Sequence, residues 1–170
     1  MMKKRDLLDI LREKNIDFQV HEHKPLYTVE DSEKLRGKID GSHTKNLFLK
    51  NKKNEFFLLS CNERAKIDLK QFSKSINAKN LSFANENYLE KYLGIKPGSV
   101  SPYALLNDEE NNVSFYLDEN LEKSEKINFH PLINDTTITM KTSDFINFIL
   151  ENKKRINIFS LEHYTIVKTL

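Results

Sequence analysis

The sequence predicts a single α/β domain built on a mixed, mainly antiparallel sheet with helices around it. Helical and strand patterns are interspersed without a regular βαβ repeat, which argues against a purely parallel sheet. Several β-rich runs are separated by short polar links, which suits antiparallel pairing. The length of 170 residues and the hydrophobic share of 38%, with 11 Phe, are enough for one core.

The N-terminal segment predicts a helix, a strand and a second helix. Apolar residues recur at helical spacing over 3–15, and a strand is expected at 18–20. Residues 21–25 are predicted to form a loop that ends in proline. Thr28 followed by Glu30 and Asp31 resembles a helix cap, so a helix is expected from there through Leu35.

A hairpin and two helices are predicted next. The β-rich runs 46–50 and 55–60 are joined by the polar link 51–54, which is typical of a hairpin. The remaining elements expected here are a helix over 68–76, a short strand at 81–83, and a helix over 86–93 that ends at Gly94.

The second half begins with an irregular loop at 96–102, where two prolines and a glycine disfavour a helix or a central strand. Strands are expected at 103–106, 113–117, 126–129 and 136–140, and a helix over 145–150 capped by residues 142–144. We therefore expect one domain over 1–150 and a C-terminal extension, 151–170, for which the sequence predicts no clear structure.

Composition excludes several classes of protein. Cys61 is the only cysteine, so the chain can form no internal disulfide and no multi-cysteine metal site, which fits a reducing compartment. No segment approaches the roughly 20 apolar residues of a membrane span, and the N-terminus lacks the apolar stretch of a signal peptide. We therefore expect a cytoplasmic protein.

Charge is distributed unevenly along the chain. Residues 1–80 carry 18 Lys and Arg against 12 Asp and Glu, whereas residues 81–170 carry 9 against 13. A basic half is compatible with binding a phosphate backbone, although most such excesses are solvated surface.

Three segments contain more residues that could bind a ligand or take part in catalysis than folding requires. Lys45 stands directly before a strand and could reach an anionic or carbonyl oxygen, although an isolated lysine is more often only solvated. Residues 98–102 form a proline-flanked loop whose glycine permits close backbone approach to a ligand, or else an ordinary connector. His130 is held at a strand end by a proline, and a structural histidine is its simplest interpretation.

Other candidates are weaker. His21 and His23 lack further ligands at the spacing of a zinc site, so no metal is expected. Cys61 lies in no known nucleophile signature, and the simplest interpretation is a partly buried residue at a strand end. Phosphate-binding Walker loops, dinucleotide fingerprints and zinc-protease helices are absent from the sequence.

In this order and spacing, the segments resemble the YbaK/ProRS-type editing domains, most closely their freestanding ProX (PrdX) branch. The resemblance covers about residues 1–150. The stretches that carry it are HTKNLFLKNKK (43–53), IDLK (67–70), LSFA (81–84), LGIKPGSVSPYALLND (93–108) and NFHPLINDTTITMKTSDFINFI (128–149).

The resemblance implies a barrel-like editing domain that hydrolyses mischarged tRNA(Pro), with Ala-tRNA(Pro) as the expected substrate and prolyl-tRNA synthetase as a further candidate partner. It assigns the essential lysine to Lys45 and a pocket residue to His130, and no cofactor. The substrate-binding residues that it implies are Asn46, Gly98, Ser99, Val100, Ser101, Pro102 and His130.

The resemblance also implies that water attacks the ester, assisted by the free hydroxyl of the terminal ribose, while Lys45 and loop amides stabilise developing charge. Three alternatives stay open at this point. One is a deacylase specific for a Cys, Ser or Thr misacyl group. The second is a non-catalytic tRNA- or synthetase-binding module, and the third is a thiol hydrolase that uses Cys61.

Overall fold

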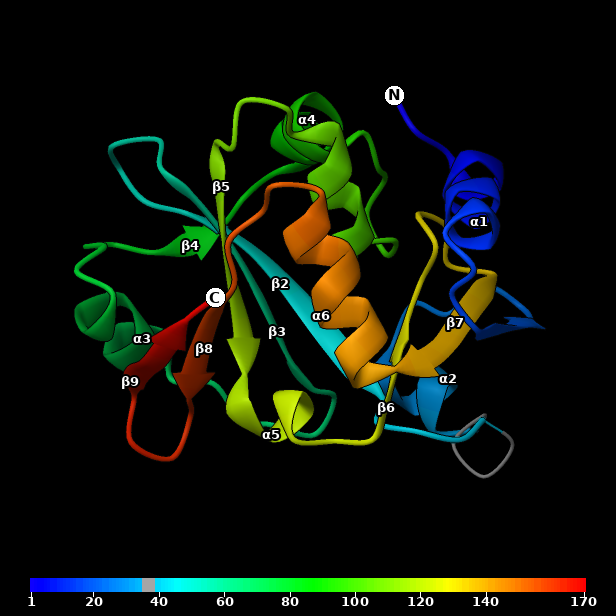
Figure 1. Cartoon of the computed structure of the whole chain (residues 1–170). Coiled ribbons are helices and arrows are strands. Elements are labelled where there is room, and N and C mark those ends of the chain that lie inside the picture. Colours follow the sequence, from blue (N-terminus) through cyan, green and yellow to red (C-terminus); the bar gives the residue numbers. More distant parts are fainter. Residues whose placement is uncertain (35–38) are drawn as a thin grey trace.

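The structure, a computed structural model, describes residues 1–34 and 39–170 and contains two sheets with helices packed on them (Figure 1). The strands are β1 (Phe18–Glu22), β2 (Thr44–Lys50), β3 (Phe56–Asn62), β4 (Ser82–Phe83), β5 (Val113–Asp118), β6 (Lys126–Phe129), β7 (Thr136–Lys141), β8 (Asn157–Ser160) and β9 (Thr165–Thr169). The α-helices are α1 (Lys4–Glu13), α2 (Val29–Glu33), α3 (Leu69–Ser75), α4 (Glu86–Tyr88), α5 (Glu119–Glu122) and α6 (Thr142–Glu151). A π-helical turn, Leu89–Leu93, continues α4, and Pro102–Asn107 is a 3-10 helix.

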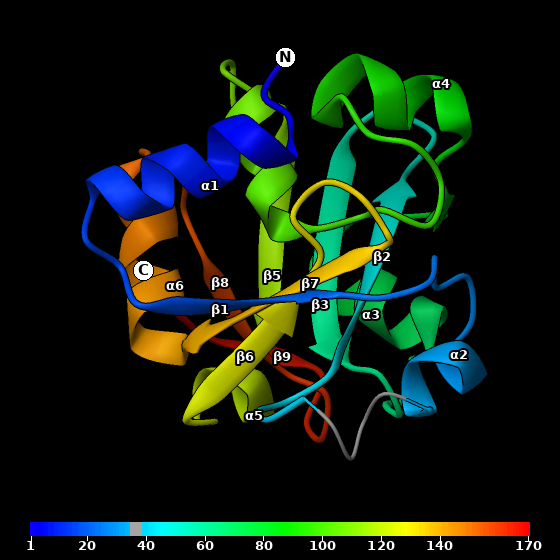
Figure 2. The same ribbon diagram turned by 90° about the vertical axis from the view of Figure 1, so that its right-hand side faces the viewer.

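The larger sheet has the strand order β4-β2-β3-β5-β8-β9, and the smaller has the order β1-β7-β6. Among the described strands, only the pairs β3–β5 and β5–β8 are parallel, so the predicted mixed, mainly antiparallel sheet is confirmed. Figure 2 shows the smaller sheet running across the strands of the larger one. The two described sheets are open, so the barrel-like detail of the prediction is not met.

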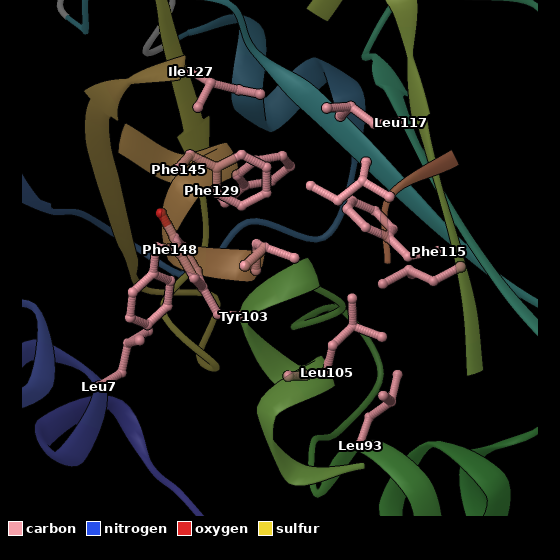
Figure 3. Packing of buried hydrophobic residues seen from close by; sticks show 14 of the residues in the cluster. Leu7, Leu93, Tyr103, Leu105, Phe115, Leu117, Ile127, Phe129, Phe145 and Phe148 are labelled. Atoms are coloured by element: carbon pink, nitrogen blue, oxygen red, sulfur yellow. The ribbon is translucent and has the colours of Figure 1, made fainter. Parts of the chain in front are cut away.

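The main core lies between the two sheets, α1 and α6. Tyr103 of the 3-10 helix is buried at its centre beside Phe129, Phe145 and Phe148, and Leu105 of the same helix is buried in the same core (Figure 3). The ring of Tyr103 makes edge contacts with these three phenylalanines at centroid distances of 5.7–6.1 Å. Burying each such side chain contributes roughly 1.5–3 kcal/mol, so this cluster fixes how the two sheets cross.

A second, smaller core lies on the other face of the larger sheet, under α3. Phe72 of α3 is fully buried and packs edge-on against Tyr116 and Phe159 at centroid distances of 5.4 and 5.0 Å. Leu49 of β2 belongs to this core, whereas its neighbour Phe48 belongs to the main core, as expected from the two-residue period of a strand.

Most predicted elements are confirmed, but the strand expected at 103–106 is wrong. That segment belongs to the 3-10 helix. Pro102 is the first residue of this helix, and Ser101 caps it. The last helix begins at Thr142, inside the segment predicted to cap it, and its own cap residue, Lys141, makes no capping hydrogen bond with its side chain. The predicted end of the second helix at Leu35 lies outside the described residues.

Residues after Leu150 complete the larger sheet. Strand β8 pairs in parallel with β5, and β9 pairs with β8 in an antiparallel hairpin. The backbone N–H groups of Ile156 and Leu170 each donate to the other residue's carbonyl, at 3.2 and 2.8 Å, which fastens the end of the chain to the start of β8. Among the described residues, no helix has the length and apolar character needed to cross a membrane.

Candidate functional site

Strand β2 positions Lys45 at the edge of the second core. Lys45 lies opposite Cys61 in the β2–β3 ladder, and it shares a strand face with Leu47 and Leu49, which pack on the side of α3. Its Nζ donates a hydrogen bond to the backbone carbonyl of Ala65, in the segment that leads into α3. The chain therefore holds the lysine half-buried, with its ammonium group at a fixed place beside the end of the sheet.

The beginning of β2 is tied to the smaller sheet. Thr44 Oγ1 donates to the Asn128 carbonyl at 2.7 Å, and Asn128 Nδ2 donates in turn to the carbonyls of Asp40 and Ser42. Asn128 lies in β6, two residues before His130. These hydrogen bonds set the distance between Lys45 on one sheet and His130 on the other.

An open cavity of about 240 Å³, called the cleft below, lies at this junction. It brings together five of the predicted site residues, Lys45, Asn46, Gly98, Val100 and His130. The residues that line it are Leu26, Tyr27, Thr28, Val29, Ser32, Thr44, Lys45, Asn46, Glu63, Gly98, Val100 and His130. Ser99, Ser101 and Pro102, which were also predicted, are buried and are not among these lining residues.

The loop 98–102 presents backbone to the cleft. Gly98 has φ +84°, a conformation that side chains with a Cβ rarely adopt, and it lies against Tyr27. A Cβ built there would lie 3.3 Å from Asn134 Nδ2 and 3.5 Å from Tyr27 Cδ1. Ser101 Oγ accepts a hydrogen bond from Tyr103 N at 3.3 Å and so caps the 3-10 helix. Gly98 therefore allows a ligand to approach the backbone closely, and Ser101 fixes the shape of the loop.

His130 faces the loop from the smaller sheet. Its Nδ1 lies 2.8 Å from the Thr136 carbonyl and must be the donor in that contact, which leaves Nε2 as the acceptor of the neutral ring. Removal from water lowers the pKa of His130 below its usual value, although the hydrogen bond to Thr136 acts in the opposite direction. The centroid of the His23 ring lies 6.1 Å from the centroid of the His130 ring.

A small inner cavity of about 30 Å³ adjoins the cleft and shares Leu26, Ser32, Thr44 and His130 with it. Its remaining lining residues are Ile39, His43, Asn128, Phe129 and Thr137. A volume of this size holds about one water molecule or a group of similar size.

Sequence reasoning missed the residues that the segment 26–32 and Glu63 contribute to the cleft. Glu63 is only 4% exposed, and its Oε2 accepts a hydrogen bond from Ser32 Oγ at 2.8 Å. Tyr27 is 73% exposed at the rim. An acidic residue just past a predicted strand was a signal for Glu63, but nothing in the sequence indicated that α2 would pack beside it.

Cys61 is fully buried, and burial raises the pKa of its thiol to about 12. The nearby ammonium of Lys45 lowers this pKa, but by less than burial raises it. The reactive form of a cysteine is the thiolate, which is scarce at neutral pH under these conditions. The arrangement therefore does not favour a thiol hydrolase.

Comparison with known proteins identifies related sequences and folds. Residues 23–148 match the family model of the aminoacyl-tRNA editing domain. The prolyl-tRNA editing protein ProX of Acetoanaerobium sticklandii is 35% identical over 153 residues, covering 89% of this chain and 93% of that protein. The prolyl-tRNA synthetase associated domain-containing protein 1 of Danio rerio is 32% identical over 152 residues, covering 88% of this chain and 83% of that one.

The fold recurs in solved structures. One is that of a candidate trans-editing enzyme for prolyl tRNA synthetase, which superposes with a TM-score of 0.68 at 16% sequence identity. The match covers 91% of this chain and 94% of that one, so the likeness extends over nearly the whole fold.

Proposed function

This chain belongs to the aminoacyl-tRNA editing domain family, and from that membership we propose that it is a trans-editing deacylase that hydrolyses the ester of mischarged tRNA(Pro). The observation that carries the proposal is the convergence of Lys45, Gly98 and His130 on one cleft from three separate parts of the chain. A cation, exposed backbone and a neutral imidazole acceptor suit an ester whose carbonyl gains negative charge during hydrolysis.

The inner cavity supports alanine as the misacyl group. A space of about 30 Å³ accommodates a methyl group, which is about the size of a water molecule, but not the three ring methylene groups of proline. A synthetase that binds proline cannot strongly exclude the smaller alanine, because a few missing carbons change binding by only about 1–3 kcal/mol. A second site that admits alanine and excludes proline by size corrects such an error.

The reaction needs no covalent intermediate with the protein. A water molecule adds its oxygen to the ester carbonyl carbon, and the ribose oxygen leaves with a proton as that bond breaks. The free hydroxyl of the terminal ribose assists by holding the water or relaying its proton. The Lys45 ammonium and the backbone around Gly98 position the terminal nucleotide and stabilise the developing negative charge.

The other cleft side chains orient the substrate. Asn46 Oδ1 accepts a hydrogen bond from Ser60 Oγ at 2.5 Å, which fixes the amide at the cleft wall. His130 Nε2 can accept a hydrogen bond from the amino group of the aminoacyl ester. The buried carboxylate of Glu63 lies on the same cleft and favours that positively charged amino group through its opposite charge.

A panel of labelled aminoacyl-tRNA(Pro) species tests the proposal. The purified protein is expected to release alanine from tRNA(Pro) rapidly, serine, cysteine and threonine more slowly, and proline hardly at all. Release of proline at a rate comparable with alanine would refute an editing role. Binding of the tRNA without release of any amino acid would identify a non-catalytic module.

Lys45→Ala tests the assignment of the central cation. The variant is expected to lose deacylation of Ala-tRNA(Pro) by at least about 100-fold, the size of effect typical for removing one group that stabilises developing charge. Lys53→Ala, in the exposed β2–β3 turn, is the matched control and should retain full activity. Thermal unfolding of both variants separates a loss of catalysis from a loss of fold.

A further inference from the structure

The segment from Arg64 to Lys79 exposes a row of basic side chains. Four lysines in it, called the α3 lysines below, are all solvent-exposed: Lys66, Lys70, Lys74 and Lys79. The only exposed acid in this segment is Asp68, whose carboxylate already accepts hydrogen bonds from two backbone N–H groups at the start of α3, at 3.0 and 3.1 Å. This surface is therefore strongly positive.

The α3 lysines differ from five lysines elsewhere on the surface that are held in ion pairs. Within the described part of the chain, none of the four makes an ion pair, whereas five other lysines pair with a carboxylate at 2.6–3.5 Å. The paired lysines are Lys4, Lys14, Lys123, Lys126 and Lys168. An unpaired group of like charges costs stability through mutual repulsion, and a polyanion bound to it removes that cost.

The surface that carries the α3 lysines, called the α3 surface below, begins at the cleft. Lys66 follows Ala65, whose carbonyl accepts the hydrogen bond from Lys45, and Arg64 is joined to Glu33 of α2 by an ion pair of 3.4 Å. Lys70 and Lys74 are four residues apart and so lie on one face of α3. The surface thus runs from the Lys45 side of the cleft to the far end of the helix.

The far end of this surface is a fixed groove. Lys70, Lys74 and Lys79 line it together with the amides of Asn77 and Asn80, and no acidic residue is among the described residues that line it. Ser73 Oγ donates to the Ala78 carbonyl, and Ala78 N donates to the Ser73 carbonyl at 2.9 Å. These two bonds hold the turn that carries Lys79 against the helix.

We propose that the α3 lysines bind the phosphate backbone of the tRNA acceptor stem while its 3′ end occupies the cleft. This assignment rests on the proposed function. The seven residues of α3 span about 10 Å at a helical rise, and Lys66 and Lys79 extend the row beyond its two ends, which matches several phosphates along one strand of a duplex. A groove lined by amides and lysines, with no acidic residue among its described lining, suits phosphate oxygens. Both groups donate hydrogen bonds, and the lysines add a positive charge opposite to that of the phosphates.

The double variant Lys70→Gln/Lys74→Gln tests this surface. Two substrates are compared, Ala-tRNA(Pro) and a CCA trinucleotide that carries alanine on its 3′ end. On the tRNA, we expect KM to rise about tenfold at low salt with kcat unchanged, and the slope of log(kcat/KM) against log salt to fall by about 1.4–1.8. On the trinucleotide, which has no stem, we expect no change.

The matched control is Lys141→Gln/Arg155→Gln, which removes the same charge from two exposed residues outside the α3 surface. Equal kinetics of the two double variants on the tRNA, or an equal loss on tRNA and trinucleotide, would overturn the proposal. If the wild type hydrolyses neither substrate, the proposed function fails. The α3 surface is then judged by binding of uncharged tRNA(Pro), where equal dissociation constants for the two double variants overturn it.

Discussion

The two walls of the cleft contribute to it in opposite ways. The β2 wall presents side chains: the Lys45 ammonium and the Asn46 amide project from a strand that both cores hold in place. The loop wall presents backbone: Gly98 opens onto the cleft, whereas Ser99, Ser101 and Pro102 are turned inward and buried.

This difference shows that a motif can be specific without every residue in it contacting a ligand. The loop needs its glycine because only that residue adopts φ +84° easily beside Tyr27. It needs its serine and proline because they start the 3-10 helix whose Tyr103 anchors the main core. Substitutions on this wall should therefore separate effects on catalysis from effects on stability.

Gly98→Ala should have the largest effect on the loop wall. The new Cβ approaches Asn134 and Tyr27, and the positive φ costs about 1–2 kcal/mol for a residue with a Cβ. Displacing the backbone by about 1 Å should lower kcat/KM for Ala-tRNA(Pro) about 100-fold. Gly94→Ala is the control, because Gly94 has φ +63° but caps a helix and is not among the cleft residues. Equal activity of both variants would show that the Gly98 backbone has no special role.

His130→Asn should have the next largest effect. His130 belongs to the smaller sheet, which forms a third wall of the cleft. Asparagine can still donate to the Thr136 carbonyl but lacks the Nε2 acceptor, so kcat/KM should fall about tenfold. Since burial lowers the pKa of His130, the wild-type ring stays neutral to lower pH than an exposed histidine does. Activity should therefore decline only on the acid side of the range in which an exposed histidine titrates.

The pH profile of the His130→Asn variant is the second measurement. The acid-side decline due to His130 should be missing from it, while a variant of the exposed His163 should keep the wild-type profile. An unchanged profile in His130→Asn would exclude a role for the neutral imidazole.

Ser101→Ala should mainly lower stability. It removes the cap of the 3-10 helix, a change that typically costs about 1 kcal/mol, and chemical denaturation measures that loss directly. Activity should stay within about threefold of the wild type, because the side chain is fully buried and is not a cleft residue. A large loss of kcat at unchanged stability would show that the hydroxyl reaches the substrate.

Local patterns in the sequence were sufficient for most of the fold. The spacing of Leu7, Leu8 and Leu11 predicted α1, and the family match confirms the resemblance drawn from motif order. The error at 103–106 arose because a short apolar run suits a strand and a buried helix equally. The decisive local signal is Ser101 followed by Pro102, which caps and begins the 3-10 helix although the prolines and glycine around it also suit a loop.

Tertiary contacts account for what the sequence did not reveal. The pairing of β8 with β5 joins residues about 40 positions apart, and no local pattern specifies such a partner. The packing of Leu26 and Tyr27 against the cleft likewise depends on how the segment after β1 crosses Asn134, whose carbonyl accepts a hydrogen bond from Leu26 N at 3.0 Å. The depth of the cleft was therefore not predictable from the sequence.

Cys61→Ser should have the smallest effect and sharpens the comparison on the β2 wall. Cys61 lies opposite Lys45 in the ladder, so it is the residue best placed to act as an alternative reactive group. Its pKa of about 12 keeps the thiol protonated at neutral pH, and a nucleophilic role requires the thiolate.

Serine can donate to the Lys45 carbonyl, which Cys61 Sγ approaches at 4.0 Å, so the substitution should be accepted in the core. We expect deacylation within about twofold of the wild type and no inhibition of the wild type by iodoacetamide, since a buried, protonated thiol reacts slowly. A folded but inactive Cys61→Ser variant would restore the thiol mechanism and move the reactive centre from Lys45 to the neighbouring strand.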